Sequence, residues 1–120
     1  MNREIPGKYF GTEIDEKCWR RYTKERMFAR GNGTFSYDDQ KISFLRLLTR
    51  VPIVIQFDTI VQVKIGKWHA GQWGAGRPIL KVVWKKGDQL LSSGFSISGK
   101  QEEMNELLSR LNSAIASNNS

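Results

Sequence analysis

The sequence predicts a mainly β domain, built from one curled antiparallel sheet or partly open barrel of six to seven strands. Three observations lead to this fold class. From Met27 to Ile97, apolar and polar residues alternate with the period of two that half-buried strands show. Clusters of Asp, Gly, Asn and Pro interrupt the alternation where turns are needed. Beyond residue 97 the period becomes helical, which predicts an amphipathic helix that closes one end of the barrel.

The length of 120 residues fits a single domain spanning 1–120. No apolar run approaches the roughly 18 residues of a membrane span, and the N-terminal stretch lacks the features of a secretory signal. The single cysteine, Cys18, cannot form an intramolecular disulfide and indicates a reducing compartment. We therefore expect a cytoplasmic protein, with peripheral attachment to a membrane as the alternative.

The N-terminal part predicts a loose leader over 1–11 and a short helix over 13–24. Residues Thr12–Asp15 have the form of a capping box, and acidic residues precede basic ones along the segment, which suits a helix dipole. The segment Trp19–Tyr22 is either a basic and aromatic patch or a helix face packed on the barrel. The second interpretation is favoured, because a short helix must bury a face to be stable.

The middle of the chain predicts six strands, and the C-terminal part predicts one helix. The strands are expected over 27–37, with a bend at the glycines, and over 41–48, 53–57, 60–65, 80–86 and 89–97. In the fourth strand Val61, Val63 and Ile65 are expected to share a face. In the fifth, Leu80, Val82 and Trp84 face inward and the residues between them outward. The helix places Met104, Leu107, Leu108, Leu111 and Ile115 on one stripe, and 116–120 form a frayed tail.

The connection over 66–79 is the first candidate for a functional site. It holds four glycines, two tryptophans and the only histidine of the chain, and residues 61–90 carry six bases against one acid. Such a local excess of positive charge attracts anionic partners. The candidate ligand-binding or partner-binding residues are Lys64, Lys67, Trp68, His69, Trp73, Arg77 and Lys81.

Three kinds of ligand suit flat aromatic faces beside cations. They are an anionic membrane interface, single-stranded nucleic acid and a protein partner anchored by tryptophan. A structural interpretation carries equal weight: Trp68 and Trp73 pack on the barrel wall, the glycines allow that path, and His69 is an ordinary loop residue.

Several segments of the chain resemble the GRAM and bacterial pleckstrin-homology-like domains. The resemblance rests on Gly33–Asp39 (GTFSYDD), Ile42–Phe44 (ISF) and Val54–Val63 (VIQFDTIVQV). Residues Lys81–Asp88 (KVVWKKGD) and Gly94–Ile97 (GFSI) resemble the last hairpin of that family before its closing helix. It covers about residues 27–115 and implies a pleckstrin-homology-like fold. The helix predicted before the first strand and the Trp/Gly-rich insertion depart from the family pattern.

The catalytic inventory is small. One histidine and one cysteine cannot supply the four ligands of a structural zinc site. The carboxylates of Asp38 and Asp39 fall on a turn, where they favour local hydrogen bonds, and the glycine spacing after residue 66 fits no phosphate-binding loop. The sequence thus predicts no enzyme, no cofactor and no metal.

The predicted function is a binding or scaffold module that recognises a protein through a sheet edge and the basic, tryptophan-bearing connection. The alternative is peripheral binding to anionic lipid head groups. Weak binding of single-stranded nucleic acid ranks third, and the oligomeric state is left open.

Overall fold

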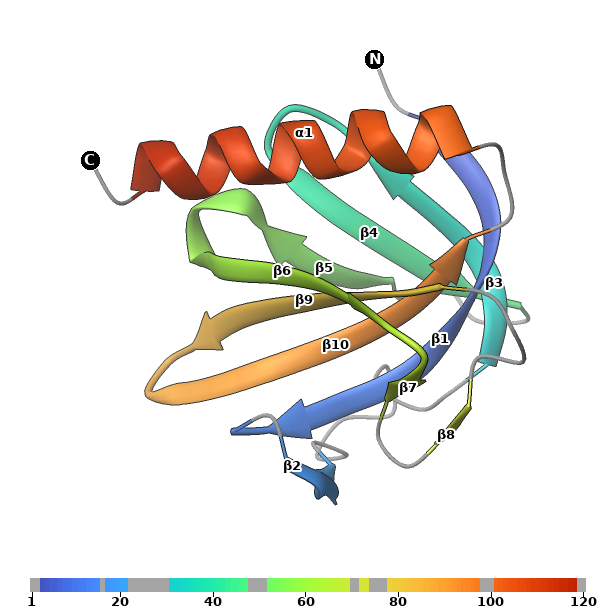
Figure 1. Cartoon of the computed structure of the whole chain (residues 1–120), viewed down its shortest axis with the longest axis vertical. Coiled ribbons are helices and arrows are strands. Elements are labelled where there is room, and N and C mark those ends of the chain that lie inside the picture. The colour runs from blue at the N-terminus through green and yellow to red at the C-terminus, as the bar shows by residue number, and fades with distance from the viewer. Residues whose placement is uncertain are drawn as a thin grey trace.

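The computed structural model describes residues 3–15, 17–21, 31–47, 52–69, 72–73, 78–97 and 101–118. This part of the chain is mainly β: seven antiparallel strands form a curled half-barrel, and the helix α1 (Gln101–Asn118) lies across one end of it (Figure 1). The strands follow one another across the sheet in the order β5 (Ile53–Gln56), β4 (Lys41–Arg46), β3 (Gly31–Tyr37), β1 (Arg3–Ile14), β10 (Gln89–Ile97), β9 (Ile79–Lys86) and β6 (Ile60–Gly66).

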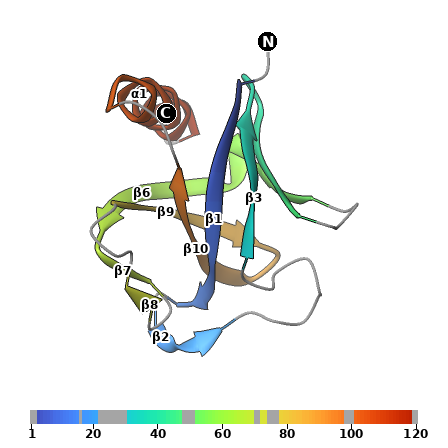
Figure 2. The ribbon, with the colours of Figure 1, turned by 90° about the vertical axis from the view of Figure 1, so that its right-hand side faces the viewer.

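Within the described residues, three short strands and one turn of 3-10 helix complete these elements. The strand β2 (Lys17–Arg21) pairs with β1, while β7 (Trp68–His69) and β8 (Gln72–Trp73) form a separate hairpin. The 3-10 turn η2 (Phe57–Thr59) joins β5 to β6. Figure 2 shows α1 at one end of the molecule and β2, β7 and β8 at the other.

Most of the predicted strands are confirmed, because turn chemistry marks their ends. In the β3–β4 turn, the Asp38 carboxylate accepts hydrogen bonds from the backbone N–H groups of Gln40 and Lys41, at 2.8 and 2.9 Å. These bonds, with that from Gln40 the strongest, hold the pKa of Asp38 below its ordinary value. The β9–β10 turn uses Gly87 at φ 61°, a left-handed conformation that glycine adopts without strain. Residues 27–30, predicted as the start of the first strand, lie outside the described residues.

The N-terminal prediction is wrong. Residues 3–14 form the longest strand, β1, which lies mid-sheet between β3 and β10, where a loose leader was expected. Lys17–Arg21 form β2, where a helix was expected. The reason lies in the tertiary contacts of this segment. Ile5, Tyr9 and Phe10 are buried, and β1 pairs with a strand on each side. These contacts outweigh the helix-capping pattern after Gly11, which only local hydrogen bonds would have supported.

The side chain of Thr12 shows how sheet contacts replace the predicted helix cap. In a helix it would have capped the first turn. Here its hydroxyl bonds the hydroxyl of Ser93 at 2.7 Å, and also that of Tyr9. The indole N–H of Trp84 donates to the same Ser93 oxygen at 3.0 Å. The Thr12 hydroxyl therefore belongs to a buried hydrogen-bond network that joins β1, β9 and β10.

The core is a cluster of aromatic rings on the inner face of the sheet. Phe95 lies at its centre, with ring centroids 5.4 Å from Tyr9, 5.3 Å from Phe35 and 5.6 Å from Phe44, and all four side chains are fully buried. The helix closes this core with Met104, Leu107 and Leu111, and Leu108 and Ile115 pack at its rim, which confirms the predicted stripe. The predicted frayed tail is corrected in part, because α1 continues to Asn118.

Two expectations about strand faces need correction. A β-bulge between Ile60 and Gln62 takes Val61 out of the alternation of β6, and Val61 is 38% exposed. Val63 and Ile65 pair with Val82 and Leu80 and so share a face as predicted; Val63 packs against the core, while Ile65 is 48% exposed. In β9 the predicted inner residues are buried, but Val83 on the outer face is only 2% exposed. This part of the sheet is therefore covered on both faces. No helix in the described part of the chain combines the length and apolar character that a membrane crossing requires.

Candidate functional site

The predicted connection folds as the small hairpin β7–β8 between β6 and β9. Its two strands pair Trp68 with Trp73 and His69 with Gln72. Arg77 and the side chains of both tryptophans lie outside the described residues. A tryptophan-bearing surface on this hairpin therefore stays a prediction, while the placement of His69 and the lysines can be described.

His69 lies against the outer face of the sheet and is only 1% exposed. Its Nε2–H donates a hydrogen bond to the carbonyl oxygen of Gly11 on β1 at 3.0 Å. The ring lies against Gly94 of β10, where an added Cβ would come within 2.5 Å of two imidazole carbons. Because Gly11 and Gly94 pair directly across the two strands, they leave a bare strip of backbone that fits the ring. His69 thus faces the sheet in this structure.

The second ring nitrogen of His69 faces a buried carboxylate. Its Nδ1 lies 3.8 Å from Oε1 of Glu13, beyond hydrogen-bond distance, and it has no hydrogen-bond partner within the described part of the chain. Burial lowers the pKa of His69 from its ordinary value of 6.5; Glu13 opposes this shift and Lys81 adds to it. The neutral imidazole is therefore the favoured form in this position.

The predicted lysines gather where the sheet ends at β6. Lys64 on β6 and Lys81 on β9 are direct cross-strand partners. The Lys81 side chain runs over Gly66, where an added Cβ would come within 2.9 Å of its Cε, and Lys67 is exposed just after β6. We call Lys64, Lys67 and Lys81 the basic edge. Like charges placed directly opposite one another repel, so an anion beside them would relieve that repulsion.

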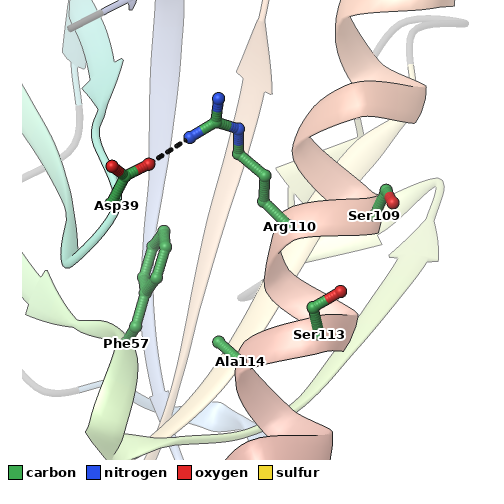
Figure 3. A pocket seen from close by; sticks show the side chains of 6 residues that line it. All are labelled: Asp39, Phe57, Ser109, Arg110, Ser113 and Ala114. Carbon is green, nitrogen blue, oxygen red and sulfur yellow. Dashed lines mark hydrogen bonds and ion pairs between the residues drawn. The ribbon is translucent and has the colours of Figure 1, made fainter. Parts of the chain in front are cut away.

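The structure also contains a hollow that sequence reasoning missed, between α1 and the β3–β4 turn (Figure 3). Its volume is about 370 Å³, and it is lined by Asp39, Phe57, Ser109, Arg110, Ser113 and Ala114. A neighbouring hollow of about 480 Å³ shares Asp39, Phe57 and Ala114 and extends to Gln40, Gln56, Asp58 and Ser117. No local pattern could have revealed this hollow, because its walls come from three separate segments of the chain, at Asp39, at Phe57 and on α1.

The charges in this hollow are engaged with one another. Arg110 Nη1 lies 2.6 Å from Asp39 Oδ1, as Figure 3 shows, and Nη2 lies 3.6 Å from Glu106. The guanidinium also lies over the ring of Tyr37, 5.7 Å from its centroid. Arg110 therefore braces α1 against the β3–β4 turn. Among the described residues, no three His, Cys, Asp or Glu side chains are grouped as metal ligands.

The class of protein defined so far is a mainly β half-barrel closed by a C-terminal helix, with a basic edge and a buried histidine under a small hairpin. Comparison with known families finds no family model that matches the chain, and comparison with curated proteins finds no match. The resemblance to GRAM and pleckstrin-homology-like domains is therefore carried forward as a proposal.

Proposed function

We propose that this protein is a non-catalytic binding module that recognises an extended, acidic segment of a protein partner along β6. The observation that carries the proposal is the position of the basic edge. Strand β6 is the last strand of the sheet order, and in the described part of the chain it forms a ladder with β9 alone. Lys64 and Lys81 lie side by side on that ladder, and the neighbouring Ile65 is 48% exposed.

A strand added to β6 would meet both kinds of contact that such recognition needs. Main-chain hydrogen bonds to an edge strand supply affinity, and side chains at alternate positions supply specificity. An acidic residue on the added strand would lie beside Lys64 and Lys81, and an apolar residue would cover Ile65. The charge contacts would mainly raise the rate of association and set the register.

We further propose that the half-barrel is of the pleckstrin-homology-like type. The order of its later elements supports this: a meander of antiparallel strands is followed by one C-terminal helix that packs Met104, Leu107 and Leu111 into the open end. The first strand and the β7–β8 hairpin are additions to the pattern on which the resemblance rests. A binding role agrees with such a scaffold, because loops and edges on a rigid sheet carry function.

The test is an NMR titration at low salt, in which a peptide of alternating Glu and Val is added to the isotopically labelled protein. We expect shift changes at the amides of β6 and β9, and a weakening of at least tenfold in the double variant Lys64→Glu, Lys81→Glu. Lys41→Glu, at an exposed position of β4 away from β6, is the matched control and should bind as the wild type does. Unperturbed β6 amides at saturating peptide concentration would refute the proposal.

The second candidate function is peripheral binding to anionic lipid, and the exposed lysine Lys67 beside the tryptophan hairpin favours it. Sedimentation with phosphatidylserine vesicles at low salt checks this, with phosphatidylcholine vesicles as the control. Pelleting that disappears at high salt and in Lys67→Glu would support lipid binding. Binding of single-stranded nucleic acid ranks below both, and it would show a steep dependence on salt.

A further inference from the structure

The β7–β8 hairpin lies on the sheet, and among the described side chains its contact centres on His69. The hairpin itself has two residue pairs, and its strand β7 packs on β1 and β9. Among the described residues, His69 is a buried side chain of the hairpin, at 1% exposure, and the hydrogen bond from His69 Nε2 to the Gly11 carbonyl ties the hairpin to β1. Docking of the hairpin therefore involves an imidazole ring whose charge can change.

The surroundings of that ring accept the neutral form. When Nε2–H donates to Gly11, the neutral ring carries no proton on Nδ1, and no hydrogen-bond partner from the described residues reaches this nitrogen. The ring lies on the backbone at Gly94, which presents no side chain that could solvate a charge. A cation here would lose its hydration and gain few contacts in return.

The charged groups around His69 do not compensate for this loss. Glu13 approaches from β1, with Oε1 3.8 Å from Nδ1, and Lys81 acts on the ring from β9. Lys64 of β6 is the cross-strand partner of Lys81, which adds positive charge on that side. The neighbouring positions of β10, Ser92 and Gly94, carry no titratable side chain. Burial is thus the largest influence on the ring and Lys81 adds to it, while the Glu13 carboxylate and the backbone groups of Gly11 and Ser92 favour the cation but do not outweigh burial.

We propose that His69 is a pH-operated latch, which holds the β7–β8 hairpin on the sheet when neutral and releases it when protonated, while the half-barrel stays folded. The lowered pKa of the docked ring agrees in sign. The docked hairpin has its full stability above about pH 6.5, where the ring is neutral in both the docked and the released state. This stability is lost as the pH falls toward the lowered pKa of the docked ring. Each unit by which docking lowers the pKa weakens docking about tenfold in acid.

The latch can be tested on the intact protein by NMR, because His69 is the only histidine and gives a single imidazole titration. We expect the protection factors of the Trp68, His69 and Trp73 amides, taken against the intrinsic exchange rate at each pH, to fall reversibly between pH 7.5 and 5, while those of the β10 amides stay high. In His69→Gln the side-chain amide can still donate to Gly11 but does not titrate. The difference in amide protection between the hairpin and β10 should therefore not change with pH. Unchanged hairpin protection in the wild type, or the same acid response in His69→Gln, would overturn the proposal.

Two further variants test the sign and do not require His69 to be replaced. Glu13→Gln removes the carboxylate that favours the cation, so it should enlarge the loss of hairpin protection in acid. Lys81→Met removes a repelling charge and should reduce that loss. Changes in the opposite directions, or a His69 pKa above 6.5, would mean that protonation tightens the hairpin, and the latch would be refuted. No binding partner is needed, so this result is independent of the proposed binding function.

Discussion

The two faces of the sheet are buried in different ways. The inner face packs aromatic rings around Phe95, and polar side chains such as Thr12 and Ser93 hydrogen-bond one another within it. The outer face near β1 and β10 buries Glu13, His69 and Ser92 under a two-pair hairpin, and there His69 Nδ1 has no hydrogen-bond partner among the described residues. Apolar burial on the inner face stabilises the fold at any pH, whereas polar burial on the outer face makes local stability depend on protonation.

The largest effect is expected from Phe95→Ala on the inner face. It removes a ring that contacts Tyr9, Phe35 and Phe44, and it leaves a cavity that rigid strands cannot close. We expect the free energy of unfolding to fall by about 3–5 kcal/mol. Urea denaturation followed by circular dichroism measures this. A loss below about 1 kcal/mol would show that the inner face is not the main source of stability.

A smaller and more local effect is expected from Gly94→Ala on the outer face of the same strand. The added methyl group would lie 2.5 Å from the imidazole of His69, so the hairpin must shift or leave the sheet. We expect a cost of about 1–3 kcal/mol, with amide protection lost at Trp68 and His69 and kept at Phe95. The double variant Gly94→Ala, His69→Ala is the control, because removing the ring should recover part of the cost. A cost that the double variant leaves unchanged would contradict the role of the ring.

The smallest effect is expected from Lys64→Glu, which converts the like-charged pair with Lys81 into an opposite-charged pair. Stability should rise by about 0.2–1 kcal/mol at low salt, and the gain should shrink as salt is added. Thermal unfolding at two salt concentrations checks this. The same change should weaken binding of the acidic peptide, so stability and binding move in opposite directions. A variant that loses both would point to a structural role for Lys64.

The inner face could be predicted from the sequence, because alternation and turn residues are local signals. The strand that ends at Ile97 and the helical stripe of Leu107 and Leu111 show this well. The strand β1 could not be predicted, because Pro6, Gly7 and Gly11 look like loop residues until their partners are known. Gly7 is needed where an added Cβ would lie 2.6 Å from the carbonyl oxygen of Ser96, a contact that no local pattern reveals.

The candidate site was predictable only in part, for the same reason. The clustering of Lys64, Lys67 and Lys81 follows from strand pairing that the sequence indicates, and the structure brings Lys64 and Lys81 together. The burial of His69 depends on Gly94 and Gly11, which lie 25 and 58 positions away along the chain. The brace between Arg110 and Asp39 spans 71 positions. A pattern within ten or fifteen residues contains no record of such contacts.

The placement of β1 between β3 and β10 has a consequence for how the chain is made. During synthesis β1 leaves the ribosome before the strands it pairs with, and one of these follows about ninety residues later, since Gly7 pairs with Ile97. Until then one edge of β1 has no β10 to pair with, and Tyr9 lacks the ring of Phe95 that will cover it. Pairings so distant in sequence make folding slow and leave an exposed strand that can pair with other chains. We therefore expect a nascent chain truncated before residue 89 to bind chaperones and to aggregate, and completion of β10 to end that vulnerability.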